Sequence, residues 1–276
     1  MSPKNMLINS FVDTAKPVKN ISPVRIVVSN ENDKLRDVVS LMLVDKYRKI
    51  PIVDKEVNLK GMVTSVDILD LLGAGEKHEI FRKNNRDMNI EIGKFATTQI
   101  KAIRPETSIS KSINAFKKGE WGLYPLVKSG KLVSVVSEWD FVKLVNKPLG
   151  IKVYEAMIER PMIVKQKYSV YDVAKMMCRG GYRRLPVVND DILVGIVTPS
   201  DILLHIRRHG IEKELYKDKT QISKIMNKEV VVINDDVDLF SAIKAMKSKR
   251  VGGLPVVVDD HIVGIITKRD ILEVIS

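Results

Sequence analysis

Four copies of one sequence unit fill almost the whole chain, and this repetition limits the fold more than any other feature. The segments GMVTSVD, SVVSEWD, GIVTPSD and GIITKRD end at Asp67, Asp140, Asp201 and Asp270. A proline lies 15 or 16 residues before each of these aspartates, within RKIPIVD, GLYPLVK, RRLPVVN and GGLPVVV. Such repetition indicates copies of one supersecondary unit that bury their apolar faces against one another.

The third copy shows the order of elements that we expect in every unit. It begins with the apolar stretch PMIVK, and SVYDVAKMMC then places apolar residues at the i, i+3, i+4 and i+7 spacing of an amphipathic helix. Two short apolar runs separated by a polar turn, LPVVNDDILVGIVT, predict adjacent strands, and DILLHI predicts a second helix. The unit is therefore β-α-β-β-α, an α/β (α+β) fold in which helices cover one face of each small sheet.

The predicted units, called repeats 1 to 4 below, span residues 17–72, 93–147, 151–208 and 221–276. A unit of about 55 residues is only marginally stable alone, so the repeats are expected to pair. The connections 73–92 and 205–220 are long and polar, whereas the connection between repeats 2 and 3 is short. We therefore predict two pairs, residues 1–148 and 149–276.

The strand–helix junction at the end of each unit supports two interpretations. In GIVTPSD, Thr198 is placed to cap a helix that starts at Pro199, and Asp201 stands where a carboxylate completes a capping box. The same carboxylate also suits the paired hydroxyls of a ribose, as the acidic residue of dinucleotide-binding folds does. Both interpretations remain open from the sequence.

Basic residues precede the proline strand only in the odd-numbered repeats. Arg48 and Lys49 do so in repeat 1, and Arg183 and Arg184 in repeat 3, whereas repeats 2 and 4 have glycine or leucine there. If paired repeats share a cleft, these cations would contact a phosphate, helped by Lys268 and Arg269 in repeat 4. Alternatively, these basic residues lie at a solvent-exposed strand edge and bind no ligand.

The motifs RRLPVVNDDILVGIVTPSDIL and GGLPVVVDDHIVGIITKRDIL, in register with looser forms near 48–69 and 121–141, resemble the CBS-domain family, named after cystathionine β-synthase. The likeness covers residues from about 17 to 276. It implies that two repeats associate into a Bateman module and that two modules stack into a flat disc. One four-repeat chain would build the disc as a monomer, as in the regulatory subunit of the AMP-activated kinase, and a homodimer is the alternative.

The resemblance also implies clefts between paired repeats that bind adenosine-containing ligands: AMP, ADP, ATP or S-adenosyl compounds. The ribose candidates are Thr64 with Asp67, Ser137 with Asp140, Thr198 with Asp201, and Thr267 with Asp270. Ser200 and Arg269 lie within the same motifs, and the phosphate candidates are Arg48, Lys49, Arg183 and Arg184. We expect the C-terminal pair of repeats to bind first.

Repeat 2 departs most from the common pattern. Ser134 replaces the glycine of the motif, Trp139 precedes the aspartate, and Trp121 stands near the proline strand. The two rings would either stack on a base or fill the cleft, and we favour filling. Four clefts therefore need not mean four ligands.

These features favour a non-catalytic regulatory sensor whose ligand-dependent change is read by a separate protein partner. The net charge of +12 supports an alternative, a nucleic-acid-binding protein. Against that alternative stand the lack of a recognised reader motif and an aromatic content of only 5%. An enzyme is disfavoured, because the sequence has no nucleophile motif and no phosphate-cradling loop, and neither a metal nor a catalytic cofactor is expected.

The predicted location is cytoplasmic. No run approaches the roughly 20 apolar residues of a membrane helix, and the N-terminus lacks a secretory pattern. The single cysteine, Cys178, excludes an intramolecular disulfide.

Overall fold

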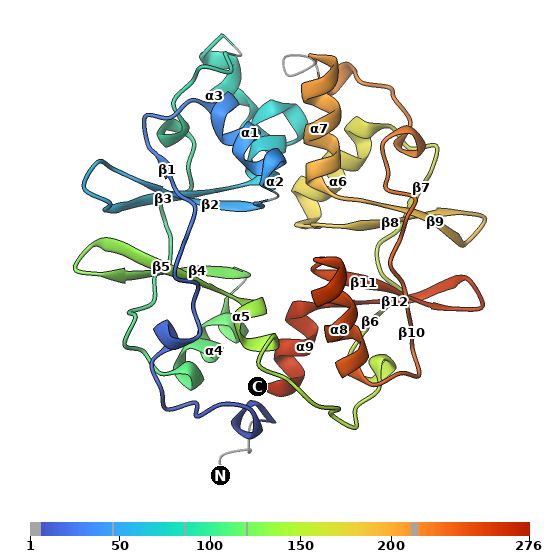
Figure 1. The fold of residues 1–276 in the computed structure, drawn as a ribbon. Coiled ribbons are helices and arrows are strands. Elements are labelled where there is room, and N and C mark those ends of the chain that lie inside the picture. The colour runs from blue at the N-terminus through green and yellow to red at the C-terminus, as the bar shows by residue number, and fades with distance from the viewer. Residues whose placement is uncertain (1–6, 46, 86, 120, 211–214) are drawn as a thin grey trace. The chain divides into compact units, whose positions relative to one another are not determined.

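The computed structural model, drawn in Figure 1, describes residues 7–45, 47–85, 87–119, 121–210 and 215–276. The chain divides into two compact units. The odd-repeat unit comprises Val27–Ile100 and Met162–Val230, which hold most of repeats 1 and 3. The even-repeat unit comprises Met1–Ile26, Lys101–Pro161 and Val231–Ser276, with most of repeats 2 and 4. Each unit therefore joins segments that are far apart in the sequence.

In the odd-repeat unit, each repeat contributes three hydrogen-bonded strands. In repeat 1, β1 (Ser29–Asn30) pairs in parallel with β2 (Lys49–Val53), which is antiparallel to β3 (Leu59–Thr64). In repeat 3, β7 (Val164–Lys165), β8 (Leu185–Asn189) and β9 (Ile192–Val197) repeat this order. The same topology thus recurs in both repeats.

Helices cover one face of each of these sheets, as Figure 1 shows. Repeat 1 supplies α1 (Leu35–Val44) and α2 (Ser65–Leu69), continued by the π-helical segment η3 (Asp70–Ala74) and by α3 (His78–Lys83). Repeat 3 supplies α6 (Val170–Gly180) and α7 (Pro199–His209). The helices of the two repeats contact each other, α1 and α2 with α7 and α2 with α6, and their buried side chains form one core.

The even-repeat unit has the same parts. In repeat 2, β4 (Leu123–Lys128) pairs with β5 (Lys131–Ser137), accompanied by α4 (Ile109–Lys118) and α5 (Glu138–Val142). In repeat 4, β10 (Ile233–Asn234), β11 (Gly253–Val258) and β12 (His261–Thr267) form the sheet, with α8 (Leu239–Lys249) and α9 (Lys268–Ile275). The short strand β6 (Ile158–Glu159) pairs with β12.

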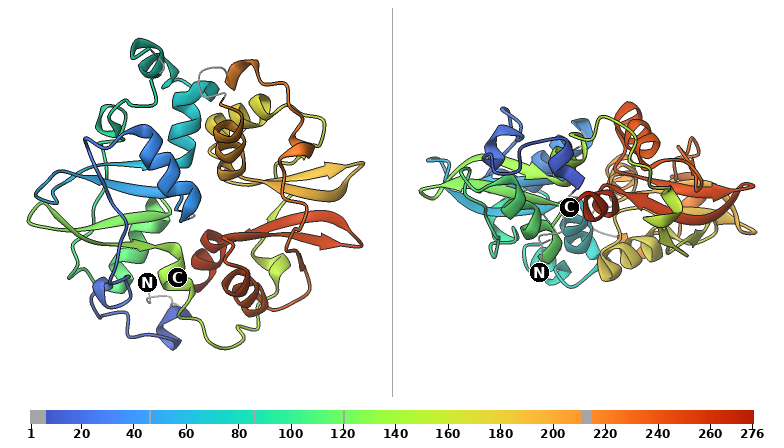
Figure 2. Two further views of the ribbon diagram at one scale, coloured as in Figure 1. Left: turned by 45° about the horizontal axis from the view of Figure 1, so that its top comes forward. Right: turned by 90° about the horizontal axis from the view of Figure 1, so that it is seen from below.

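Short 3-10 turns complete the connections between these elements. They are η1 (Leu7–Ser10), η2 (Val18–Asn20), η4 (Ile92–Lys94), η5 (Val153–Glu155), η6 (Leu215–Lys217) and η7 (Ile222–Lys224). The first of them, η1, packs against α9, so the N-terminal segment lies beside the C-terminal helix in the even-repeat unit (Figure 2).

The predicted amphipathic helix of repeat 3 is confirmed. Val170, Val173, Ala174 and Met177 are fully buried. Ser169 begins the helix, because its hydroxyl accepts a hydrogen bond from the backbone N–H of Asp172 at 3.1 Å.

The predicted tight turns between the paired strands are also confirmed. Only Asp190 and Asp191 separate β8 from β9, and Asp259 and Asp260 separate β11 from β12. All four have positive φ, between 48° and 66°. Two successive residues with positive φ are what a type I′ hairpin requires, and aspartate tolerates this conformation better than most residues.

The opening strand of each unit is shorter than the apolar stretches suggested. It has two residues in repeats 1, 3 and 4, and in repeat 2 it is reduced to a bridge between Ile103 and Leu126. In repeat 1 it begins at Ser29, after the stretch VRIVV. This segment pairs with only one neighbouring strand, so little backbone hydrogen bonding defines its length.

The connection 73–92 was expected only as a polar linker, but it contains α3 and the fully buried Phe81.

The predicted pairing of repeats, residues 1–148 with one another and 149–276 with one another, depends on how the two units are placed and stays a prediction. Within the part of the chain described, no helix is both long enough and apolar enough to span a membrane.

The glycine of the repeated motif is explained by close packing. A Cβ on Gly195 would lie 2.5 Å from the sulfur of Met226, and one on Gly264 would lie 2.3 Å from the sulfur of Met157. Repeat 2 accepts Ser134 at this position, where its hydroxyl donates to the carbonyl of Pro23 at 2.8 Å. The departure in repeat 2 therefore has its own polar partner.

Candidate functional site

All four strand–helix junctions form a capping box. The hydroxyl of the N-cap residue donates to Oδ2 of the aspartate three residues later, at distances of 2.6 to 2.8 Å for Thr64, Ser137, Thr198 and Thr267. The backbone N–H of the same residue donates to the same oxygen, at 2.7 to 2.9 Å. The capping interpretation is thus confirmed, and only the second carboxylate oxygen, Oδ1, is left for another partner.

In repeats 1 and 2 a lysine takes that second oxygen. Lys77 Nζ lies 2.5 Å from Oδ1 of Asp67 and also contacts the hydroxyl of Thr97. Lys143 Nζ lies 2.7 Å from Oδ1 of Asp140 and donates to the carbonyl of Ile21 at 3.0 Å. Each lysine therefore neutralises its carboxylate from within the protein.

In repeats 3 and 4 the second oxygen is open. Among the described residues, none donates a hydrogen bond to Oδ1 of Asp201 or of Asp270. At the helical position that Lys143 has in repeat 2, repeat 3 has Leu204 and repeat 4 has Glu273. The four junctions share one backbone geometry but differ in the charge around the carboxylate.

The surroundings of the two open carboxylates shift their pKa values in the same direction. Burial raises the pKa of Asp201, although the hydrogen bonds from Thr198 and the charge of Arg48 oppose the shift. Burial also raises the pKa of Asp270, and the negative charges of Glu273 and Glu138 add to the rise. Asp201 thus has a cation nearby, and Asp270 has further carboxylates.

The cation beside Asp201 comes from another repeat. Arg48 precedes β2 in repeat 1, yet its guanidinium interacts electrostatically with Asp201 and with Arg183 of repeat 3. Burial of the guanidinium lowers the pKa of Arg48, although the residue as a whole is exposed. The negative charge of Asp201 opposes this shift, and the positive charge of Arg183 adds to it. The charges of Asp201 and Arg183 both act on Arg48, so a carboxylate and two guanidinium groups from two repeats are linked electrostatically. Such a set of groups can bind an anion that also offers hydroxyls.

The other site residues predicted in repeats 1 and 3 are sequence neighbours of Arg48, Arg183 and Asp201. Lys49 is the first residue of β2, and Arg184 directly precedes β8. Ser200 is half-buried at the second position of α7. Arg48 is therefore linked electrostatically to Asp201 and Arg183, and the remaining three residues are their neighbours in the sequence.

In the even-repeat unit the basic residues of repeat 4 have partners within the unit. The guanidinium of Arg269 donates to the carbonyl of Gly119 at 2.9 Å and pairs with Glu273 at 3.2 Å. Lys268 Nζ lies 4.7 Å from the ring centre of Trp139. Trp139 and Trp121 are half-buried and pack against the core of this unit. Their role in filling a cleft stays a prediction.

Sequence reasoning did not find the two lysines or the contribution of Arg48. Lys143 follows Asp140 at i+3, a spacing at which helical side chains meet, so this pair could have been predicted. Lys77 lies ten residues after Asp67, and Arg48 is in a different repeat from Asp201. Only the fold brings those pairs together.

The described part of the chain contains no cluster of three or more His, Cys, Asp or Glu side chains that could hold a metal ion. Burial, with the nearby charges of Asp70 and Asp67, raises the pKa of the Cys178 thiol to about 12. A thiol with such a pKa stays protonated at neutral pH and is a poor nucleophile.

Comparison with known proteins gives relatives of nearly the same length. The uncharacterized protein MJ1225 of Methanocaldococcus jannaschii is 29% identical over 267 residues, which cover 90% of this chain and 95% of that protein. The crystal structure of MJ1225, proposed to be an archaeal homolog of g-AMPK, matches with a TM-score of 0.85 and 25% identity, over 94% of this chain and 100% of that one.

Two other relatives define the extent of the similarity. An uncharacterized 33.4 kDa protein from the ribosomal RNA operon of Thermofilum pendens is 28% identical over 93% of this chain and 89% of its own length. Inosine-5'-monophosphate dehydrogenase of Thermoplasma acidophilum is 32% identical over 121 residues, which cover 41% of this chain but only 23% of the enzyme. The similarity thus leaves most of that enzyme unmatched.

The family model of the CBS domain matches four segments, residues 18–74, 92–147, 153–208 and 222–276. These segments contain all four capping-box junctions described above. With its mixed α/β repeats and its likeness to MJ1225, the chain belongs to the CBS-domain family as a protein of four CBS repeats.

Proposed function

We propose that this protein is a non-catalytic regulator that binds an adenosine-containing ligand at its strand–helix junctions. The observation that carries the proposal is the open carboxylate oxygen of Asp201, together with the electrostatic interaction of Arg48 with Asp201 and with Arg183. A carboxylate oxygen accepts hydrogen bonds from ribose hydroxyls, and guanidinium groups bind phosphate. A separate protein partner would read the ligand-dependent change.

The two guanidinium groups favour a ligand with phosphate. AMP, ADP and ATP carry negative charge that Arg48 and Arg183 would pair with, whereas an S-adenosyl group carries none at the corresponding position. The relation to MJ1225, with its proposed homology to g-AMPK, supports the same class of ligand. We therefore place the adenine nucleotides before S-adenosyl compounds.

The number of ligands is proposed to be two per chain. Thr198 with Asp201 and Thr267 with Asp270 keep an open oxygen, whereas Lys77 and Lys143 take the corresponding oxygens of Asp67 and Asp140. A ribose at either of the lysine-bound junctions would first have to displace an ion pair. This agrees with the expectation that the C-terminal repeats bind first.

Isothermal titration calorimetry with AMP, ADP, ATP, adenosine and S-adenosylmethionine tests the proposal. We expect AMP to bind more tightly than adenosine, because only AMP contacts the guanidinium groups. Lack of binding by all five compounds at millimolar concentration would overturn the nucleotide proposal. Light scattering of the same samples distinguishes a monomer from a homodimer.

A second candidate function is binding of nucleic acid, supported by the net charge of +12. Binding driven by such a charge weakens steeply as salt increases. A mobility shift with RNA and DNA at low and at moderate salt tests it, and lack of a salt-sensitive shift removes this candidate. A cytoplasmic location is part of both proposals.

A further inference from the structure

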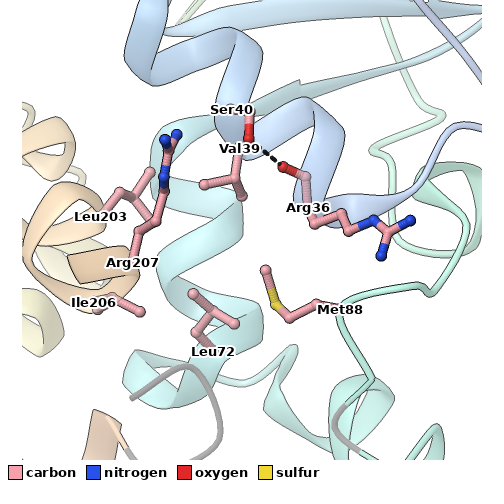
Figure 3. A pocket seen from close by; sticks show the side chains of 8 residues that line it. All are labelled: Arg36, Val39, Ser40, Leu72, Met88, Leu203, Ile206 and Arg207. Atoms are coloured by element: carbon pink, nitrogen blue, oxygen red, sulfur yellow. Dashed lines mark hydrogen bonds between the residues drawn. The ribbon is translucent and has the colours of Figure 1, made fainter. Parts of the chain in front are cut away.

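A small pocket lies between α1 and α7 in the odd-repeat unit, away from the strand–helix junctions (Figure 3). Its volume is about 230 Å³. Helix α1 of repeat 1 forms one side and helix α7 of repeat 3 the other, with Leu72 of η3 and Met88 completing the wall. An occupant of this pocket would touch both repeats at once.

The floor of the pocket is apolar and well packed. Val39, Leu72, Leu203 and Ile206 are all at most 5% exposed. Met88 is half-buried, and in Figure 3 its side chain points into the space above Leu72. Water in such a space finds few hydrogen-bond partners, so an apolar group would replace it favourably.

The rim of the pocket is cationic. Among the described residues that line the pocket, the two charged ones are Arg36 and Arg207, and none is acidic. The guanidinium of Arg36 points away from Arg207 and lies 3.7 Å from Asp37, so its charge is partly offset. The guanidinium of Arg207 instead rises beside Val39 and Ser40 (Figure 3). Arg207 is therefore the better placed anchor for an anion.

Ser40 limits what kind of group can bind beside Arg207. Its hydroxyl donates a hydrogen bond to the carbonyl of Arg36 at 2.9 Å. The hydroxyl therefore has no second proton to donate to a bound anion. The anion would then be held by the guanidinium fork alone. A flat carboxylate matches such a fork with two parallel hydrogen bonds.

We propose that this pocket binds a small organic acid, with its carboxylate on Arg207 and its aliphatic or aromatic body over Val39, Leu72 and Ile206. The pocket is smaller than the roughly 300 to 1,000 Å³ of sites for drug-sized ligands. None of the described residues that line it has an acidic side chain to accept ribose hydroxyls. A nucleotide does not fit this description, so the pocket is a site for a second class of ligand.

The test uses the full chain and compares acids with neutral compounds of the same shape. Saturation-transfer NMR and calorimetry would be carried out with hexanoate and benzoate, with hexanamide and benzamide, and with hexyl phosphate. We expect both acids to bind and both amides to bind at least about tenfold more weakly, because a charged hydrogen bond is lost. Equal binding of acids and amides, or tighter binding of hexyl phosphate, would overturn the assignment of a carboxylate.

Three variants locate the site. Arg207→Gln should weaken benzoate binding about tenfold or more, whereas Arg208→Gln removes the same charge from the next residue and should change nothing. Ser40→Leu keeps both arginines but fills the space, and should abolish binding. Circular dichroism checks that each variant is folded. Unchanged affinity in Arg207→Gln or in Ser40→Leu, or no binding of either acid to the unmodified protein, would refute the proposal.

Discussion

Lys143 Nζ lies 2.7 Å from Oδ1 of Asp140, the carboxylate oxygen that the capping box leaves unused. In repeat 4 the equivalent helical position is Glu273, three residues after Asp270. Both junctions belong to the even-repeat unit and have the same backbone geometry. The charge at this one position therefore provides a direct test of which junctions accept a ribose.

Removing the lysines should make the first two repeats competent to bind nucleotide. Lys77→Met frees the second oxygen of Asp67, and Lys143→Leu gives repeat 2 the residue of repeat 3. An ion pair of this partly exposed kind contributes up to about 1 kcal/mol, so affinity at each junction should rise roughly fivefold. Equilibrium dialysis with AMP should show more than two bound nucleotides per chain in the double variant. An unchanged stoichiometry and affinity would contradict the role given to the lysines.

Introducing a lysine should close the junction of repeat 4. Glu273→Lys places an ammonium group three residues after Asp270, as in repeat 2, and should weaken AMP binding at that junction roughly fivefold in the same dialysis experiment. Glu273→Gln is the matched control, since it removes the acidic charge without adding a competitor. Loss of the site in both variants would mean that Glu273 itself is needed, for example through its pair with Arg269.

Arg48 should matter for the phosphate and not for the nucleoside. Arg48→Met should weaken AMP binding about tenfold, the usual effect of losing one charged hydrogen bond, and leave adenosine binding unchanged. Lys55→Met, which removes an exposed charge from the same repeat, serves as control. Calorimetry that showed equal losses for AMP and adenosine would instead assign Arg48 to the packing of repeats 1 and 3.

Stability and ligand binding should respond to pH in opposite directions. Burial raises the pKa of Asp201 above its ordinary value of about 3.9. The folded state therefore holds this proton more tightly than the unfolded state, and stability declines as pH rises from the ordinary value through the raised one. Nucleotide binding needs the ionised carboxylate, so affinity should decline as pH falls through the same range.

Asp201→Asn separates the two effects. Its amide has no charge to bury, so its unfolding free energy should fall less than that of the unmodified protein as pH rises, and its weakened AMP affinity should no longer depend on this titration. Thermal melting and calorimetry between pH 4 and about pH 7 measure both quantities. A constant difference in stability across this range would show that Asp201 has an ordinary pKa.

Cys178 should be unreactive in the folded protein. Burial raises the pKa of its thiol to about 12, and its sulfur lies 3.8 Å from the carbonyl oxygen of Val66. Iodoacetamide at pH 8 should label it far more slowly in buffer than in denaturant, as followed by mass spectrometry. Similar rates in both solutions would mean that the packing of α6 is loose.

The fold of each repeat could be predicted in most respects from its own residues. The helix over residues 170–180, the two-residue turns of aspartates and the capping boxes all depend on groups within about four positions of one another. The regular backbone geometry of a helix or a turn brings such groups together without any contact between distant parts of the chain. The opening strands could not be predicted to the residue, because their length depends on pairing with a single distant neighbour.

The sequence by itself determined that the chain has four CBS-like repeats and that each places a carboxylate at a helix start. Tertiary structure decided that Asp67 is paired with a lysine and that Asp201 interacts with an arginine of another repeat. Lys77 reaches Asp67 only because residues 70–83 fold back as η3 and α3, and Arg48 meets Asp201 only because the helices of repeats 1 and 3 share one core. Such contacts depend on how whole elements pack, so no spacing along the chain reveals them.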